Sequence, residues 1–240
     1  MLSAQTQLVS DPRVISLRRV TKRYYVDGHW KHVLNGITCS IPFGSSLGIV
    51  GVNGSGKSTL MRILAGVEAP TSGEVIRVGT VSWPLAAGSG FMPRLTGEQN
   101  VRFIARLYGL DPKDCIEFVR DFSELGPALK EECYTYSAGM RARLGFAASM
   151  AVAFDFYLVD EVVAVGDQRF QEKCRRAFAQ RRRNATVVMI SHQPATLQQF
   201  CDSAAILQGG RLIFYDTVEH AMRAYRSVTG GRPVWETAEA

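Results

Sequence analysis

Apolar residues along the chain recur at two spacings, which predicts that strands and helices alternate. Helical spacing is expected over 58–65, before Gly66 and Pro70 end that helix. Such alternation is typical of an α/β domain with a mostly parallel sheet, to which a hairpin turn at 208–211 adds an antiparallel β portion. The short apolar runs expected to form strands are 33–41, 46–50, 74–81, 156–159 and 186–190.

The middle of the chain carries three signals for the start of a helix. Thr96 with Gln99 three residues later forms a capping box, Asp111 precedes a proline that can open a second helix, and Ser137 can cap a third. Apolar side chains follow each start at helical spacing. We therefore expect one domain over 1–240, with a core at about 13–83 and 151–228 and a helical insertion at about 84–150.

The composition excludes several classes of protein. The chain has 240 residues, 46% of them hydrophobic and 21% charged, so a disordered or fibrous protein is excluded. No run approaches the roughly 18 apolar residues of a membrane-spanning helix, and we expect no secretory signal at the N-terminus. Five cysteines without a C-x-x-C pair favour a reducing cytoplasm over disulfides or a zinc site. The net charge of +6 permits an anionic partner without identifying one.

A glycine-rich segment follows the second predicted strand. Residues 51–58, G-V-N-G-S-G-K-S, match the P-loop pattern G-x-x-x-x-G-K-[ST] and lie between a predicted strand and a predicted helix. Glycines let backbone N–H groups approach phosphate oxygens, and the helix N-terminus adds positive potential. Lys57 can reach the β- and γ-phosphates, and the Ser58 hydroxyl can ligate Mg²⁺. The residues expected to bind the nucleotide here are Gly51, Asn53, Gly54, Ser55, Gly56, Lys57, Ser58 and Thr59.

Two carboxylates stand at the end of the predicted strand 156–159. Asp160 is placed to hold Mg²⁺ through water, and Glu161 to polarise an attacking water. Paired carboxylates after a strand can also be solvated loop charges. Their position downstream of a P-loop favours a Walker B segment and hydrolysis of a nucleoside triphosphate.

The segment Y-S-A-G-M at 136–140, about twenty residues before Asp160, resembles the signature of the ABC transporter family, usually written L-S-G-G-Q. Ser137 and Gly139 match that signature. The resemblance implies that these two residues cap the γ-phosphate of ATP bound to a second copy of the chain. It also implies a separate membrane-spanning permease that the ATP-driven dimer moves.

Further positions match motifs of the same family. His192, after the strand 186–190, corresponds to its switch histidine, which contacts the γ-phosphate, and Asp167 lies in a D-loop-like segment. Tyr24 matches the aromatic residue that stacks on adenine, with Tyr25 as a close competitor. The resemblance therefore implies ATP and Mg²⁺ as ligands, with Glu161 and His192 as catalytic residues.

The family normally has a glutamine in a loop between the P-loop and the helical insertion. This chain lacks it, because no glutamine lies between Ser58 and Gln99. The stretch 82–91 that replaces it, together with the signature and the residues after Asp160, is similar to the ATP-binding subunits of ABC-2 type capsular polysaccharide exporters. That similarity implies a peripheral subunit at the cytoplasmic face of the inner membrane. The alternatives are an exporter of O-antigen, teichoic acid or a drug, and, less favoured, a soluble ABC ATPase.

Other classes of protein fit the sequence less well. A P-loop kinase or switch GTPase would not need Ser137 and Gly139, and no guanine-selecting N-K-x-D is present. The arginines between Arg175 and Arg183 are interpreted as the solvated face of a helix that opens at Asp167. Contact of this face with lipid headgroups is a weaker alternative, and no nucleic-acid partner is expected because no aromatic platform interleaves with the arginines.

Replacing Glu161 by glutamine is expected to preserve ATP binding and to remove most hydrolysis, because an amide cannot polarise the attacking water. The ATP-bound variant should then accumulate as a closed dimer. Steady-state phosphate release and the size of the variant in Mg-ATP measure the two effects. Unchanged turnover would contradict the role given to Glu161.

Overall fold

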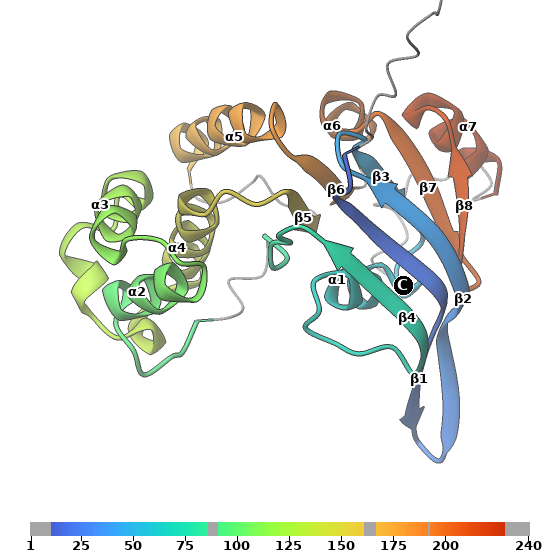
Figure 1. Cartoon of the computed structure of the whole chain (residues 1–240), viewed down its shortest axis with the longest axis horizontal. Coiled ribbons are helices and arrows are strands. Elements are labelled where there is room, and N and C mark those ends of the chain that lie inside the picture. The colour runs from blue at the N-terminus through green and yellow to red at the C-terminus, as the bar shows by residue number, and fades with distance from the viewer. Residues whose placement is uncertain (1–10, 86–90, 161–166, 192, 229–240) are drawn as a thin grey trace, which may run out of the picture.

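The computed structural model describes residues 11–85, 91–160, 167–191 and 193–228 (Figure 1). The strands are β1 (Val14–Val26), β2 (His29–Pro42), β3 (Leu47–Val50), β4 (Ser72–Val78), β5 (Phe156–Asp160), β6 (Thr186–Ile190), β7 (Ser203–Gln208) and β8 (Arg211–Tyr215). The helices are α1 (Lys57–Leu64), α2 (Gly97–Leu107), α3 (Pro112–Ser123), α4 (Ala138–Ala151), α5 (Gln168–Arg182), α6 (Pro194–Phe200) and α7 (Val218–Val228), with 3₁₀ turns η1 (Gly126–Lys130) and η2 (Cys133–Thr135).

The larger sheet of the described residues has the strand order β5-β6-β3-β7-β8. Strand β3 lies at its centre and runs parallel to both β6 and β7, whereas β8 turns back antiparallel to β7. Every residue of β3 and β6 is buried, as expected for parallel strands covered on both faces. The predicted α/β class with a mostly parallel sheet is therefore confirmed.

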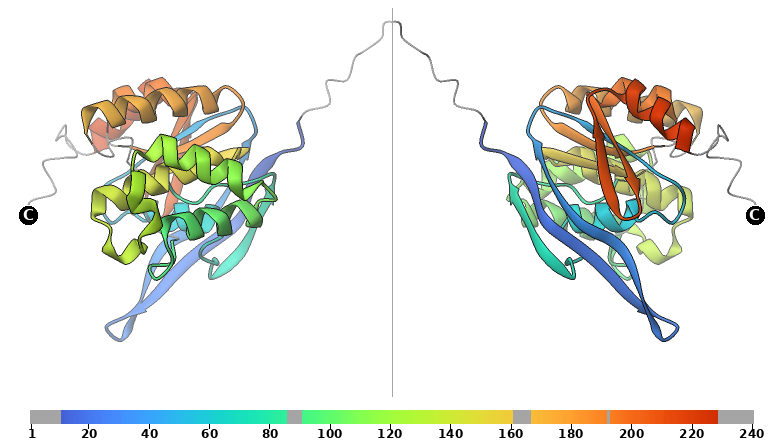
Figure 2. Two further views of the ribbon diagram at one scale, coloured as in Figure 1. Left: turned by 90° about the vertical axis from the view of Figure 1, so that its left-hand side faces the viewer. Right: turned by 90° about the vertical axis from the view of Figure 1, so that its right-hand side faces the viewer.

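The smaller sheet is antiparallel and has the order β2-β1-β4. Its long hairpin of β1 and β2 projects beyond the rest of the molecule (Figure 2). The hydrophobic pattern did not predict β1 as a strand, because a bulge at Arg19, whose φ is 48°, interrupts its alternation and shifts its register against both neighbours. The turn is Asp27-Gly28, in which both residues have positive φ (50° and 81°), as type I′ hairpins require.

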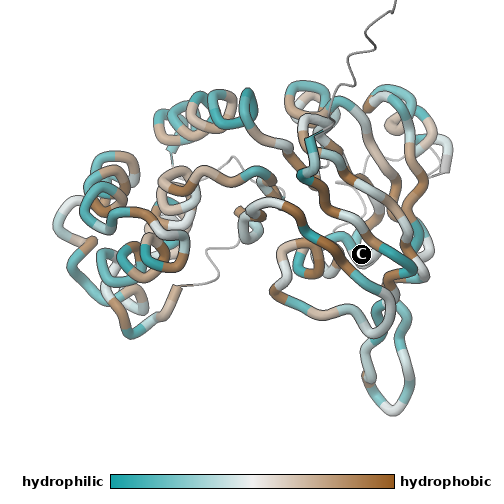
Figure 3. Tube along the Cα trace, viewed as in Figure 1, coloured by the Kyte–Doolittle hydropathy of each residue, from teal (hydrophilic) through white to brown (hydrophobic). Residues whose placement is uncertain are grey.

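Helix α1 packs between the two sheets. Its side chains Leu60, Met61, Ile63 and Leu64 are at most 1% exposed and belong to one apolar core with β1, β2 and β3. A second core on the opposite face of the larger sheet holds α5, α6 and α7. The strands that lie between these two cores are the hydrophobic stretches of the tube in Figure 3. Successive residues of β5 alternate between these cores, which fixes the strand against rotation.

Helices α2, α3 and α4 gather at one end of the molecule, beside the sheets (Figure 1). Each begins where the sequence predicted it. Thr96 and Gln99 form the expected capping box, Asp111 accepts a hydrogen bond from the N–H of Lys113, and Ser137 accepts one from the N–H of Met140. These caps satisfy N–H groups that the helices leave unpaired.

Helix α5 begins at its cap Asp167, as expected, and has two kinds of arginine. Arg175 and Arg176 are exposed, as predicted, and both pair with Glu172 on the same helix. Arg181 and Arg182 are not simply solvated, because they donate to the backbone carbonyls of Met150 and Gln199 and so join α5 to the ends of α4 and α6.

None of the helices in the described ranges combines the length and the apolarity needed to cross a bilayer. All five cysteines lie in these ranges as free thiols, and burial raises the pKa of Cys174 and of Cys201 to about 12, so both stay protonated and unreactive.

Leu158 of β5 is fully buried in the core that holds α1. Its replacement by alanine is expected to lower the free energy of unfolding by about 2–5 kcal/mol, because a cavity remains where the side chain stood. Urea unfolding followed by circular dichroism measures this loss. Ile213→Ala on the edge strand β8, where the side chain is 44% exposed, is the matched control and should lose much less.

Candidate nucleotide site

The carboxyl ends of β3 and β5 lie at one edge of the larger sheet, separated by a single strand. Ile190 of β6 is paired with Ile49 on one side and with Asp160 on the other, so the P-loop and Asp160 face the same pocket. This pocket has a volume of about 520 Å³. It is lined by Tyr24, Val26, Lys31, Val33, Asn53, Gly54, Gly56, Lys57, Ser58, Thr59, Asp160 and Ile190.

The P-loop ends at Gly56, which is the N-cap residue of α1 with a φ of 104°. A Cβ there would lie 2.7 Å from a methyl carbon of Val33, so position 56 requires glycine both for its backbone and for the close approach of β2. No side chain caps α1, and its first turn holds no acidic residue. The positive end of the helix is therefore available to an anion.

Lys57 lies in the first turn of α1 and is buried. Its ammonium group donates to the carbonyl oxygens of Gly51, at 2.7 Å, and Val52, at 3.0 Å. These hydrogen bonds hold the ammonium group against the start of the P-loop. A buried cation beside an uncapped helix N-terminus is a strong centre of positive potential. The donor set at this loop therefore suits phosphate oxygens.

Ser58 of α1 and Asp160 of β5 line the same pocket from two sides. Within the described ranges no group of three or more His, Cys, Asp or Glu side chains could hold a metal ion by itself. A hydroxyl and one carboxylate suit Mg²⁺, which usually keeps several waters and takes further ligands from bound phosphates. Glu161 and His192, the predicted catalytic residues, lie outside the described residues.

Of the two candidate aromatic residues, only Tyr24 lines the pocket. Its hydroxyl donates to Glu68 at 2.6 Å. Tyr25 is 64% exposed and packs edge-on against Trp30, its partner across the hairpin, with 5.2 Å between the ring centroids. Because successive side chains of a strand point to opposite faces, the hairpin presents Tyr24 to the pocket and Tyr25 away from it.

Four pocket residues, Val26, Lys31, Val33 and Ile190, were not predicted as site residues from the sequence. The first three come from the β1–β2 hairpin, on the same face as Tyr24. The Asp27-Gly28 dipeptide was the available signal, since a two-residue turn of this type places Lys31 opposite Tyr24.

Ser137 and Gly139 lie at the start of α4, both exposed, and neither lines the pocket of the P-loop. Glycine within a helix costs about 1 kcal/mol relative to alanine. Packing in this chain gives no reason for that cost, because a Cβ at Gly139 would meet only the hydroxyl of Ser137, at 3.9 Å. The open space above Gly139 is available to a group from outside the chain.

Arg143 of α4 connects the helical region to the start of α5. Its guanidinium bonds Asp167 at 2.9 Å and Glu124 at 3.5 Å, and lies 4.4 Å from the ring centre of Phe170. Asp167 also caps α5 by accepting from the N–H of Phe170, and that bond, with help from Arg143, lowers the pKa of the Asp167 carboxyl. The predicted D-loop residue is thus held by the helix that carries the signature.

A groove of about 540 Å³ is lined by residues of α3, of the end of α4, of the beginning of β5 and of α5. Its lining includes the aromatic side chains of Phe118, Phe154 and Tyr157 and the polar side chains of Gln180 and Arg181 of α5. Trp83, in the stretch that replaces the missing glutamine, packs edge-on against Phe154 with 5.4 Å between the ring centroids. Residues 86–90 of that stretch lie outside the described residues.

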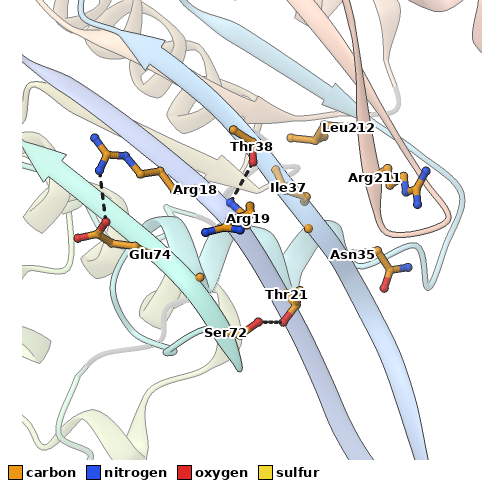
Figure 4. Close-up of a pocket in the computed structure, with 12 residues that line it drawn as sticks. Arg18, Arg19, Thr21, Asn35, Ile37, Thr38, Ser72, Glu74, Arg211 and Leu212 are labelled. Carbon is orange, nitrogen blue, oxygen red and sulfur yellow. Dashed lines mark hydrogen bonds and ion pairs between the residues drawn. The ribbon is translucent and has the colours of Figure 1, made fainter.

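A larger recess of about 1090 Å³ opens on the outer face of the smaller sheet (Figure 4). Its arginines do not converge on one point: Arg18 extends toward Glu74, 3.6 Å away, whereas Arg211 points away on the far side of β2. None of the nucleotide motifs lines this recess. The pocket at the P-loop is therefore the candidate site.

Comparison with known proteins identifies relatives of the chain. Residues 34–164 match the family model described as ABC transporter. The chain is 44% identical to the ATP-binding protein BexA of Haemophilus influenzae, over 88% of this chain and 98% of that protein. It is 43% identical to the capsule polysaccharide export ATP-binding protein CtrD of Neisseria meningitidis serogroup B, over 90% of this chain and 100% of that protein.

Solved structures show the same fold at lower identity. A dimeric ATP-binding cassette bound to ADP and Pi, in a post-hydrolysis state, is 21% identical to the chain. It superposes with a TM-score of 0.70 over 84% of this chain and 98% of that one.

Lys57→Ala is expected to weaken Mg-ATP binding by roughly ten- to a hundredfold, because hydrogen bonds to a charged partner are lost. Calorimetric titration measures the dissociation constant. Lys113→Ala, which removes an exposed lysine of α3, is the matched control and should bind normally. Equal affinity of the Lys57 variant and this control would refute the assignment of the phosphate site.

Proposed function

Because this chain belongs to the ABC transporter family, we propose that it is the ATP-hydrolysing subunit of an exporter that carries a capsular or other cell-surface polysaccharide out of the cell. One observation carries the polysaccharide assignment: its relatives at 43–44% identity match almost end to end, and one of these is named for capsule polysaccharide export. Relatives named for export of O-antigen or teichoic acid are less similar, at 36–37% identity.

Different residues of the site bind the phosphates, the base and the metal ion, and others orient the attacking water. Lys57 and the N-terminus of α1 stabilise the negative charge that develops on the phosphates, and Tyr24 stacks on adenine. Ser58 and Asp160 hold Mg²⁺, which when bound neutralises further phosphate charge. Glu161 orients the attacking water and His192 contacts the γ-phosphate.

A second copy of the chain completes the site. Ser137 and Gly139 are exposed and lie outside the pocket of their own P-loop, which supports their action on ATP held by another copy. Because Gly139 has no side chain and little lies near it, a phosphate can approach the backbone there closely. Two chains associate head to tail, each covering the other's pocket, and closing and reopening of this dimer is the power stroke.

Transport further needs a permease, since the described helices do not span a bilayer. The groove lined by Phe118 and Phe154 suits a short amphipathic segment of that permease, because its lining combines aromatic side chains with polar side chains of α5. Phe103 and Leu107 of α2 are further exposed apolar side chains of the helical region. The chain then works as a peripheral protein on the cytoplasmic face of the inner membrane.

Deleting the gene in its source organism is expected to remove the surface glycan and to build up polymer inside the cell. Wild-type protein should restore export. Glu161→Gln should not restore it, nor should Phe118→Asp, which keeps ATP binding but disturbs the groove. Antibody or lectin staining of intact and permeabilised cells measures both pools. Normal surface glycan in the deletion strain would refute the proposed cargo.

A further inference from the structure

Glu68 lies in the connection between α1 and β4, and its carboxylate accepts hydrogen bonds from three side chains. One oxygen accepts from the Tyr24 hydroxyl, at 2.6 Å, and from the Lys22 ammonium, at 2.7 Å. The other accepts from Nε of Arg62, at 3.0 Å. A single carboxylate thus joins strand β1, which carries Tyr24 and Lys22, to helix α1, which carries Arg62.

The carboxylate of this cluster is partly shielded from solvent and ionised. The side chains of Lys22 and Glu68 are 14% and 20% exposed, and that of Arg62 is 44% exposed. Burial alone would raise the pKa of the Glu68 carboxyl, but the hydrogen bonds from Lys22, Tyr24 and Arg62 outweigh it and lower the pKa to about 2. The carboxylate is therefore ionised near neutral pH and can accept the hydrogen bond from Tyr24.

Arg62 extends the cluster to the phosphate end of the pocket. Its guanidinium also donates to the hydroxyl of Thr59, at 3.2 Å, and approaches the Tyr24 hydroxyl at 3.4 Å. Thr59 lines the nucleotide pocket one residue after Ser58. The wall formed by Tyr24 and the floor formed by the P-loop helix are therefore connected through Glu68 and Arg62.

We infer that Glu68 is a positioning residue, which holds the ring of Tyr24 at the wall of the pocket before a nucleotide arrives. The inference rests on the proposed function, in which Tyr24 stacks on adenine. A ring that is already fixed loses little rotational freedom when the base binds. Immobilising such a side chain otherwise weakens binding by about three- to tenfold.

A purely electrostatic or structural role of Glu68 would change the binding of all phosphate ligands in the same way. Removing the carboxylate leaves Lys22 and Arg62 without their anion, and the added positive potential acts on phosphates whether or not a base is attached. A general loosening of the fold also affects every ligand alike. Only a role through Tyr24 changes the binding of ATP relative to a triphosphate without a base.

The test measures the dissociation constants of Mg-ATP and of Mg-tripolyphosphate, which lacks sugar and base, by calorimetry. All variants carry Glu161→Gln so that ATP is not hydrolysed. Glu68→Ala is expected to weaken ATP about three- to tenfold relative to tripolyphosphate. Tyr24→Phe, which removes one hydroxyl and leaves both cations paired, should do the same even if Glu68→Ala fails to fold. In the Tyr24→Phe background, Glu68→Ala should change the ratio less than about twofold.

Glu74→Ala is the matched control, because it removes an exposed carboxylate of β4 that is paired with Arg18 and does not contact Tyr24. Its ratio should equal that of the parent protein. Tyr24→Ala separates the inference from the proposed function. An unchanged ratio in Tyr24→Ala refutes the adenine contact itself. A changed ratio there, with normal ratios in Tyr24→Phe and Glu68→Ala, overturns the inference alone.

Discussion

The burial of β3 between two parallel strands is the constraint on which the rest of the molecule depends. Its four residues are all buried, and hydrogen bonding to β6 and β7 fixes both of its edges. The chain must leave this strand at the edge of the sheet, where the next residues are the P-loop. The adjacent pairing of β6 with β5 brings Asp160 to the same edge. The site therefore owes its geometry to strand order and register.

Other elements are fastened to this centre by a few polar contacts in addition to apolar packing. Arg77 of β4 donates to the last carbonyls of α1, among them Leu64 at 2.7 Å, which ties the smaller sheet to the P-loop helix. Arg143 ties the signature helix to the start of α5. Arg77 thereby satisfies carbonyl groups that the C-terminal end of α1 leaves without a partner inside the helix.

The sequence predicts those parts of the fold and the site whose physical causes are local. The P-loop, the helix caps at Thr96, Asp111 and Ser137, and the buried run before Asp160 are such parts, because spacing within a few residues decides them. Strand β1 was missed because a bulge breaks its period, and Lys31 because its place depends on pairing across a hairpin. Glu68 was missed because its partner Tyr24 is 44 residues away, and a charged residue in a loop carries no local sign of such a contact.

The packing of α1 between two sheets has a consequence for exchange of ligand. A helix that is enclosed on both sides restricts the motion of the P-loop attached to it, so this part of the pocket is rigid. On the proposed function, a second copy of the chain covers the open side of the pocket, so exchange of the nucleotide requires that copy to move away.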